Sequence, residues 1–170
     1  MQPSLRALPM LLAAATAATA TLFASGAHAA DDEVERMEVP GQAPAYFVAP
    51  RGKGRKPVVV WVHARSGDPR ADCAKWGKLV SEHAWLLCPS GPEDRGNGAR
   101  GWNNSWTAGK VSVDAAFGAF RVVHAKQLAA KGHALIGFSE GAFVAMNVGV
   151  REPETFSRWL ILAASDQYWG

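Results

Sequence analysis

The chain has 170 residues and a formal net charge of +3 at neutral pH, with its basic residues scattered along the sequence. A single domain of this length buries roughly two-thirds of its unfolded surface, so a real hydrophobic core is expected. The sequence carries no basic stripe of the kind that binds nucleic acid. It also carries no cofactor motif and no cluster of metal ligands. These features exclude a nucleic-acid-binding protein and predict a globular domain without a cofactor.

Residues 1–29 have the pattern of a secretory signal peptide. Arg6 precedes an apolar stretch rich in alanine and threonine, and the segment ends in the small-x-small sequence AHA. We expect cleavage after Ala29, which leaves residues 30–170 as one domain in a secreted or periplasmic protein. The alternative is an uncleaved N-terminal anchor. The stretch is weak as a permanent span, so no stable membrane anchor is expected.

The remaining chain alternates predicted strands and helices. Two short strands are predicted at 34–40 and 45–50, and four buried strands at 57–64, 84–90, 133–139 and 159–165. The four buried strands are continuous apolar runs, which are typical of parallel strands covered on both faces. Apolar residues at helical spacing predict helices at 72–84, 112–131 and 140–152, with Ser112 as the N-cap of the second helix and Gly132 at its end. The sequence therefore predicts an α/β fold, a mostly parallel twisted sheet with helices on both faces.

The two cysteines are expected close together. Cys73 opens the helix that follows one buried strand, and Cys88 closes the neighbouring strand, so both are placed at the same edge of the sheet. An exported protein meets an oxidising compartment, where a disulfide is allowed. The sequence leaves a disulfide and two free buried thiols open.

The sequence GFSEG at 137–141 lies between a predicted buried strand and a predicted helix. A serine in this context is typical of a nucleophile elbow, and the two glycines leave room where side chains would clash. Ser139 is therefore the candidate nucleophile. The backbone N–H of Glu140 is a candidate donor to an oxyanion. The alternative is a glycine-rich strand–helix turn that binds nothing or binds a phosphate.

A second candidate element is the turn in WVHARSGDPRAD, which leaves the first buried strand. With this turn and the GxSxG sequence, the order of elements resembles the α/β-hydrolase family, and secreted carboxylesterases and polyester depolymerases in particular. In that family a His-Gly turn supplies the other N–H of the oxyanion hole, but position 64 here is Ala. The resemblance implies that this N–H comes from Arg65, with Ala64 as the alternative.

The loop at 91–110 is similar to the loop that faces the substrate in this family. Trp102, Trp106 and His63 are candidates for lining a substrate pocket. The alternative is that the tryptophans pin down a long loop, and both readings stay open. The resemblance implies a small-molecule ester or related acyl compound as the substrate.

The resemblance covers residues 34–165, the first six strands of an eight-stranded family. In the family the catalytic acid and then the catalytic histidine follow the serine, whereas all five histidines here precede Ser139. His63 is expected at the same sheet edge as Ser139 and is interpreted as structural, with a Ser139–His63 catalytic dyad as the alternative. Asp166 is interpreted as a polar residue at a strand exit, since no histidine is left for it to orient.

These observations predict a truncated family member whose serine hydrolase activity is impaired. Its last predicted strand would form an apolar edge without a neighbour, which natural proteins usually protect, so the chain is expected to be marginally stable. A non-catalytic binding protein or an inactive gene fragment of the same fold is the alternative.

Overall fold

The computed structural model describes residues 33–164. The predicted signal peptide and Asp166 lie outside these residues. In chain order the elements are β1 (Glu35–Met37), β2 (Ala45–Val48), β3 (Val58–Val62), α1 (Pro69–Val80), β4 (Trp85–Cys88), β5 (Glu93–Asp94), β6 (Arg100–Gly101), α2 (Trp106–Val123), β7 (His133–Phe138), α3 (Glu140–Arg151) and β8 (Phe156–Leu162).

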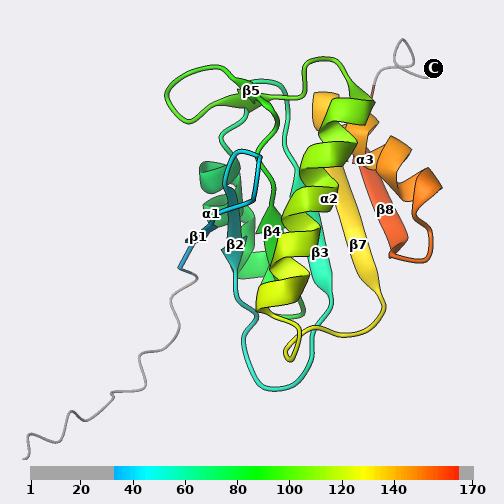
Figure 1. The fold of residues 1–170 in the computed structure, drawn as a ribbon. Helices are drawn as coiled ribbons and strands as arrows, with labels where there is room; N and C mark the ends of the chain where they lie inside the picture. Colours follow the sequence, from blue (N-terminus) through cyan, green and yellow to red (C-terminus); the bar gives the residue numbers. More distant parts are fainter. Residues whose placement is uncertain (1–32, 165–170) are drawn as a thin grey trace, which may run out of the picture.

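The main sheet has six strands in the order β1-β2-β4-β3-β7-β8 (Figure 1). The four strands from β4 to β8 are parallel, and β1 and β2 join them as antiparallel strands. The strands β3 and β4 are buried along nearly their whole length, which is why their sequences are continuous apolar runs. The predicted α/β fold with a mostly parallel sheet is confirmed.

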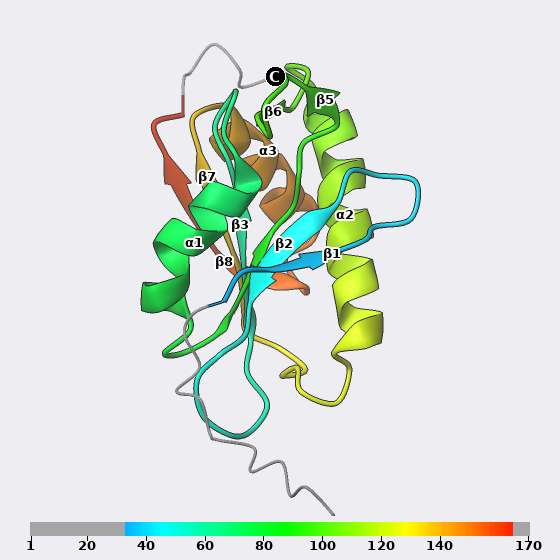
Figure 2. The same ribbon diagram turned by 90° about the vertical axis from the view of Figure 1, so that its left-hand side faces the viewer.

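Helices cover both faces of this sheet (Figure 2). The helices α2 and α3 pack on one face and on each other, whereas α1 packs on the opposite face over β2 and β4. The larger core lies on the α2–α3 face and includes Leu135, Phe117 and Phe120, while the smaller core lies under α1 and includes Trp61 and Leu86. This three-layer arrangement leaves the carboxyl ends of the parallel strands as the edge where ligands bind in such folds.

Among residues 33–164, the strand β8 is the last of the sheet and pairs with β7 alone. Trp159 and Leu160 of this strand are 43% and 51% exposed. The predicted apolar edge strand is therefore present, although it covers 156–162 and not 159–165.

A disulfide joins Cys73 of α1 to Cys88 at the end of β4, with the two Cα atoms 5.9 Å apart. Both residues are fully buried in the smaller core. The bond resolves the alternative that the sequence left open. It fixes α1 to the sheet beside the turn that precedes this helix.

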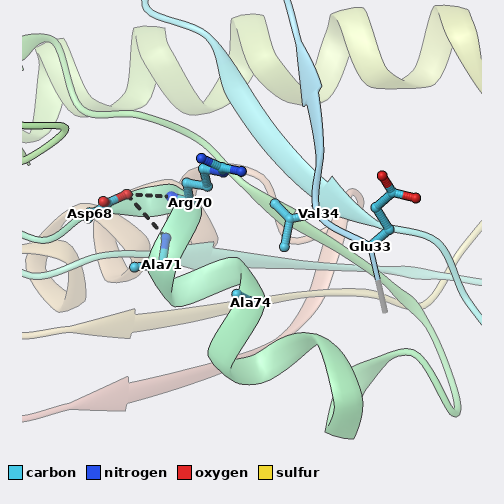
Figure 3. Close-up of a pocket in the computed structure, with 6 residues that line it drawn as sticks. All are labelled: Glu33, Val34, Asp68, Arg70, Ala71 and Ala74. Carbon is cyan, nitrogen blue, oxygen red and sulfur yellow. Dashed lines mark hydrogen bonds between the residues drawn. The ribbon is translucent and has the colours of Figure 1, made fainter. Parts of the chain in front are cut away.

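The helix α1 begins at Pro69, three residues before the predicted start at 72. Asp68 caps it, because its side chain accepts the N–H groups of Arg70 at 2.8 Å and Ala71 at 3.1 Å (Figure 3). A proline in the first helical position is compatible with this start, since its missing N–H has no partner there in any case. The sequence carried this capping signal in the Asp-Pro pair.

The predicted start of α2 at 112 is also wrong. The helix begins at Trp106, because the hydroxyl of Ser105 accepts an N–H from the first turn at 3.2 Å. Ser112 lies inside the helix, is buried, and donates its hydroxyl proton to the side chain of Gln42 at 2.9 Å. Ser112 is therefore buried because its hydroxyl has a partner outside the helix, and it does not mark the start of the helix.

The same helix ends at Val123, before the predicted end at 131. The following residues turn back onto the sheet, because Lys56 donates to the carbonyl of Gln127 at 3.0 Å and accepts from Ala129 at 2.8 Å. Gly132 does not end the helix. It has a φ of +86° in the turn that leads into β7.

Candidate active site

Ser139 occupies the turn between β7 and α3, at the carboxyl edge of the sheet. Its φ of 55° and ψ of −120° are sparsely populated for a residue with a side chain, so the backbone here is strained. The backbone holds this conformation through two hydrogen bonds: the N–H donates to Leu162 at 2.9 Å, and the carbonyl accepts from Ala142 at 2.9 Å. The residue is exposed, and its side chain makes no capping hydrogen bond to α3.

The glycines on either side of Ser139 let three backbone segments meet. A Cβ on Gly137 would lie 2.6 Å from the Cα of Ala142, which is too close for any real contact. A Cβ on Gly141 would overlap the carbonyl oxygens of Val62 and His63. The β7–α3 turn therefore packs directly on the end of β3, and the two glycines leave room for this contact.

His63 follows β3 and is fully buried beneath this contact. Its Nδ1 donates to the carbonyl of Ala64 at 2.7 Å, and its Nε2 accepts the N–H of Gly91 at 3.1 Å. These partners fix one neutral tautomer, and burial lowers the pKa of the ring below its usual value. Because both ring nitrogens are bonded to backbone, the ring has none left to take a proton from Ser139.

Trp102 is also fully buried, and its indole N–H donates to the carbonyl of His63 at 2.7 Å. The two rings lie against each other with centroids 4.6 Å apart. The prediction that His63 and Trp102 line a substrate pocket is therefore wrong, because neither side chain is accessible. Trp102 pins down its loop, which is the alternative that the sequence left open.

Trp106 is half-buried at the start of α2. Its ring lies 3.9 Å from the guanidinium carbon of Arg151, the last residue of α3. Ser139 precedes the opposite end of α3, and twelve residues of helix are about 18 Å long. The contact thus helps to join α2 to α3, and a substrate-pocket role for Trp106 stays a prediction.

Arg65 lies in the exposed turn between β3 and α1, at the same edge as Ser139. The N–H of Gly67 donates to the carbonyl of Ala64 at 2.9 Å and closes this turn. The guanidinium of Arg65 reaches the β7–α3 turn, where it lies 3.4 Å from the carboxylate of Glu140. It also contacts the side-chain oxygen of Asn104 in the loop before α2. The structure thus brings Arg65 and Glu140 together beside Ser139.

The side chain of Glu140 has a role that the sequence pattern did not indicate. It is 7% exposed, and its two oxygens accept the N–H of Trp102 at 3.2 Å and the N–H of Asn104 at 3.0 Å. Asn103 and Asn104 both have positive φ, of 55° and 49°, which asparagine tolerates better than most residues. The two consecutive asparagines are typical of a tight loop, and the backbone N–H groups of such a loop need acceptors from another part of the chain.

The other histidines of the described chain lie away from Ser139. His133 begins β7, and the six residues of this strand span about 20 Å. Its Nδ1 accepts the N–H of Val58 at 3.0 Å. His124 follows the end of α2 and packs against Trp85, and His83 is exposed in the turn before β4. No histidine within 33–164 is therefore placed to act as a base for Ser139.

A pocket of about 450 Å³ lies beside the N-terminal end of α1 (Figure 3). It is lined by Glu33, Val34, Asp68, Arg70, Ala71 and Ala74, none of which is a predicted site residue. One of its two carboxylates, that of Asp68, already caps α1. Between residues 33 and 164 there is no group of three or more His, Cys, Asp or Glu that could hold a metal ion, and no helix is both long and apolar enough to cross a membrane.

Three solved structures share this fold at low sequence identity. Acetyl xylan esterase from Aspergillus awamori has a TM-score of 0.61 at 14% identity, over 80% of this chain and 56% of that chain. Dipeptidyl peptidase 4 from Porphyromonas gingivalis has a TM-score of 0.58 at 20% identity, over 78% of this chain and 20% of that chain. A membrane phospholipase A described as a bacterial virulence factor has a TM-score of 0.53 at 15% identity, over 78% of this chain and 40% of that chain.

No protein-family model matches the chain, and no curated protein sequence matches it significantly. The chain spans about half the length of the acetyl xylan esterase and less of the other two proteins. The described residues therefore have the α/β-hydrolase fold over a part of its usual length, and the likeness shows the fold alone.

Proposed function

We propose that this chain carries the nucleophile half of a serine hydrolase that acts on esters or related acyl compounds. The strained, exposed backbone of Ser139, between a parallel strand and a helix, is the observation that carries the proposal. A turn of this geometry presents a serine hydroxyl above the carboxyl edge of the sheet, which is the arrangement of a nucleophile elbow. Strained residues cluster at functional sites.

In the proposed reaction the Oγ of Ser139 attacks the carbonyl carbon of the ester. The carbonyl oxygen takes up negative charge, and the backbone N–H groups of Glu140 and Arg65 donate to it. The first N–H of α3 has no partner within the helix and is available for this purpose. One such donor typically lowers the barrier by about 3–4 kcal/mol. The alcohol then leaves, and water hydrolyses the acyl group from Ser139.

The proton of the Ser139 hydroxyl must pass to a general base, and none of the histidines within 33–164 is placed to receive it. We therefore expect this chain to hydrolyse esters poorly by itself. Loss of triad members in other serine hydrolases costs factors on the order of 10⁴ to 10⁶ while some oxyanion-hole catalysis remains. The same observation favours a second candidate function, the binding of an ester or acyl group at Ser139 without turnover.

The substrate class rests on two kinds of support. The proposed parts, a serine and two N–H donors, suit acyl transfer and require no metal or cofactor. Two of the structures with this fold are named as an acetyl xylan esterase and a phospholipase, and both of these names denote ester hydrolysis.

We also propose that the protein is exported, because the disulfide between Cys73 and Cys88 suits an oxidising compartment.

A fluorophosphonate probe tests the proposal, because it reacts with serines that have nucleophile and oxyanion geometry. The wild-type chain is expected to be labelled at Ser139, slowly, and Ser139→Ala should not be labelled. Ser157→Ala is the matched control, since Ser157 is also exposed but lies in β8. Equal labelling of the wild type and Ser139→Ala would contradict the proposal. Labelling without hydrolysis of p-nitrophenyl acetate would favour the binding function over turnover.

A further inference from the structure

The carboxylate of Glu140 joins three segments that are far apart in the sequence. It begins α3, and it accepts hydrogen bonds from the backbone of Trp102 at 3.2 Å and of Asn104 at 3.0 Å. It also pairs with the guanidinium of Arg65 at 3.4 Å, and that guanidinium contacts the side chain of Asn104. One nearly buried carboxylate thus connects the β3–α1 turn, the loop before α2, and the turn that bears Ser139.

These connections bear on the two proposed oxyanion donors. The N–H of Glu140 belongs to the same residue as the carboxylate, and the N–H of Arg65 belongs to the turn that the guanidinium anchors. The Arg65 turn is exposed, and Ser66 within it has a positive φ of 60°, a strained conformation that persists only where contacts hold it; the hydrogen bond from Gly67 to Ala64 is one of them. The ion pair with Glu140 is such a contact, and it comes from the residue next to Ser139.

We propose that the side chain of Glu140 is a positioning residue for the oxyanion site. It holds the Arg65 turn and the 102–104 loop against the start of α3, so that the N–H groups of Arg65 and Glu140 serve one oxyanion above Ser139. This inference rests on the proposed function, since it assigns a role within the same site.

A carboxylate fits this position better than its near relatives. It is an acceptor at both oxygens and meets two backbone N–H groups and a guanidinium, all of which are donors. Glutamine in its place would turn an NH₂ group towards at least one donor. Aspartate keeps the charge but is shorter by one methylene, so it cannot reach all three donors at once. The N-terminal end of α3 adds further favourable potential for the negative charge.

The experiment compares Glu140→Gln, Glu140→Asp and the wild type in two measurements. The first is amide hydrogen exchange by NMR at Trp102 and Asn104. The second is the rate of labelling by a fluorophosphonate. Glu93→Gln is the matched control, because this carboxylate lies in β5 and pairs with Arg95 at 3.0 Å, outside the proposed site.

In Glu140→Gln we expect both amides to exchange about tenfold faster or more, since hydrogen bonds to charged groups contribute about 1.5–3 kcal/mol. The N–H of Gly91, which donates to His63, should keep its wild-type exchange rate and serves as an internal reference. Labelling should slow by about tenfold, because the N–H of Arg65 would be less well placed as an oxyanion donor. Glu140→Asp should fall between Gln and the wild type, and Glu93→Gln should match the wild type.

A double variant adds a test of the coupling. If Glu140 acts through Arg65, Arg65→Ala/Glu140→Gln should be labelled no more slowly than Glu140→Gln alone. Faster amide exchange with unchanged labelling would overturn the inference, because Glu140 would then hold the loop without affecting the donors. Unchanged exchange and unchanged labelling would overturn it as well. A wild-type chain that is not labelled at all would instead overturn the proposed function.

Discussion

Two strand-to-helix turns meet at the carboxyl edge of the sheet, and they differ in how their polar groups are satisfied. In the β3–α1 turn, His63 is buried with both ring nitrogens hydrogen-bonded, and its carbonyl accepts the indole N–H of Trp102. In the β7–α3 turn, Ser139 is exposed, has a positive φ, and makes no capping hydrogen bond to α3.

The difference shows how a small domain can hold a strained residue in place. A strained conformation persists when its surroundings determine it fully. Here the β3–α1 turn, whose polar groups are hydrogen-bonded, surrounds the strained residue. The carbonyl oxygens of Val62 and His63 at its start leave no room for a Cβ on Gly141. The histidine, which the chemistry of serine hydrolases would make a base, instead supports the scaffold on which Ser139 rests.

The contact between the turns gives the largest expected effect. Gly141→Ala places a methyl group against the two β3 carbonyls, and backbone can yield little, so we expect a loss of about 3 kcal/mol in the free energy of unfolding. Urea denaturation measures it. Gly118→Ala is the control: a Cβ there meets nothing within 4 Å in α2, so it should stabilise by about 0.5–1 kcal/mol. Equal stability of Gly141→Ala and the wild type would show that the turns are not in contact.

The support for the β3–α1 turn is expected to depend on the disulfide. Cys73 and Cys88 are 15 residues apart, and a closed loop of this length stabilises by about 3 kcal/mol in the chain-entropy model. A reducing agent should therefore lower the midpoint of urea denaturation of the wild type. The midpoint of Cys73→Ser/Cys88→Ser should already be low and should not respond to the reducing agent. A wild type that is indifferent to reduction would contradict this prediction.

Acid should lower the stability of the folded protein through His63 in the β3–α1 turn. Burial lowers the pKa of His63 in the folded protein from its ordinary 6.5. Below about pH 6.5 the unfolded chain therefore binds a proton that the folded chain does not, and stability falls as the pH drops, by up to about 1.4 kcal/mol per pH unit, until the folded pKa is reached. His124 and His133 act in the same direction.

The slope of stability between pH 6.5 and pH 5 tests this assignment. His63→Gln should be less stable than the wild type at pH 7 but should show a shallower slope. His83→Gln should keep the wild-type slope, because His83 is exposed. A slope that His63→Gln leaves unchanged would show that His63 binds protons equally in the folded and unfolded protein over this pH range.

The strained turn gives the smallest expected change in stability and the largest in reactivity. Ser139→Gly should stabilise the protein by about 1 kcal/mol, since glycine adopts positive φ without strain. Ser139→Ala should leave the free energy of unfolding nearly unchanged. Neither variant should react with a fluorophosphonate. If Ser139→Gly were less stable than the wild type, the serine would hold its turn together and would not be strained by it.

Much of this arrangement could be predicted from local patterns. The continuous apolar runs predicted the four parallel strands, and GFSEG predicted a turn between a strand and a helix. The helix starts were less accurate: Asp68 caps α1 three residues before the predicted start, and Ser105, not Ser112, caps α2. The pocket assignment for Trp102 failed because a tryptophan in a loop sequence looks the same whether it faces a ligand or the core.

The sequence by itself determined the fold class and the place of Ser139, since both follow from periodicities and glycine positions that act over a few residues. The tertiary structure decided the roles of His63, Trp102 and Glu140. Each of these depends on hydrogen bonds to residues between 28 and 75 positions away in the chain. Such partners meet only when the sheet has formed, because the strand order places segments side by side that no local pattern relates.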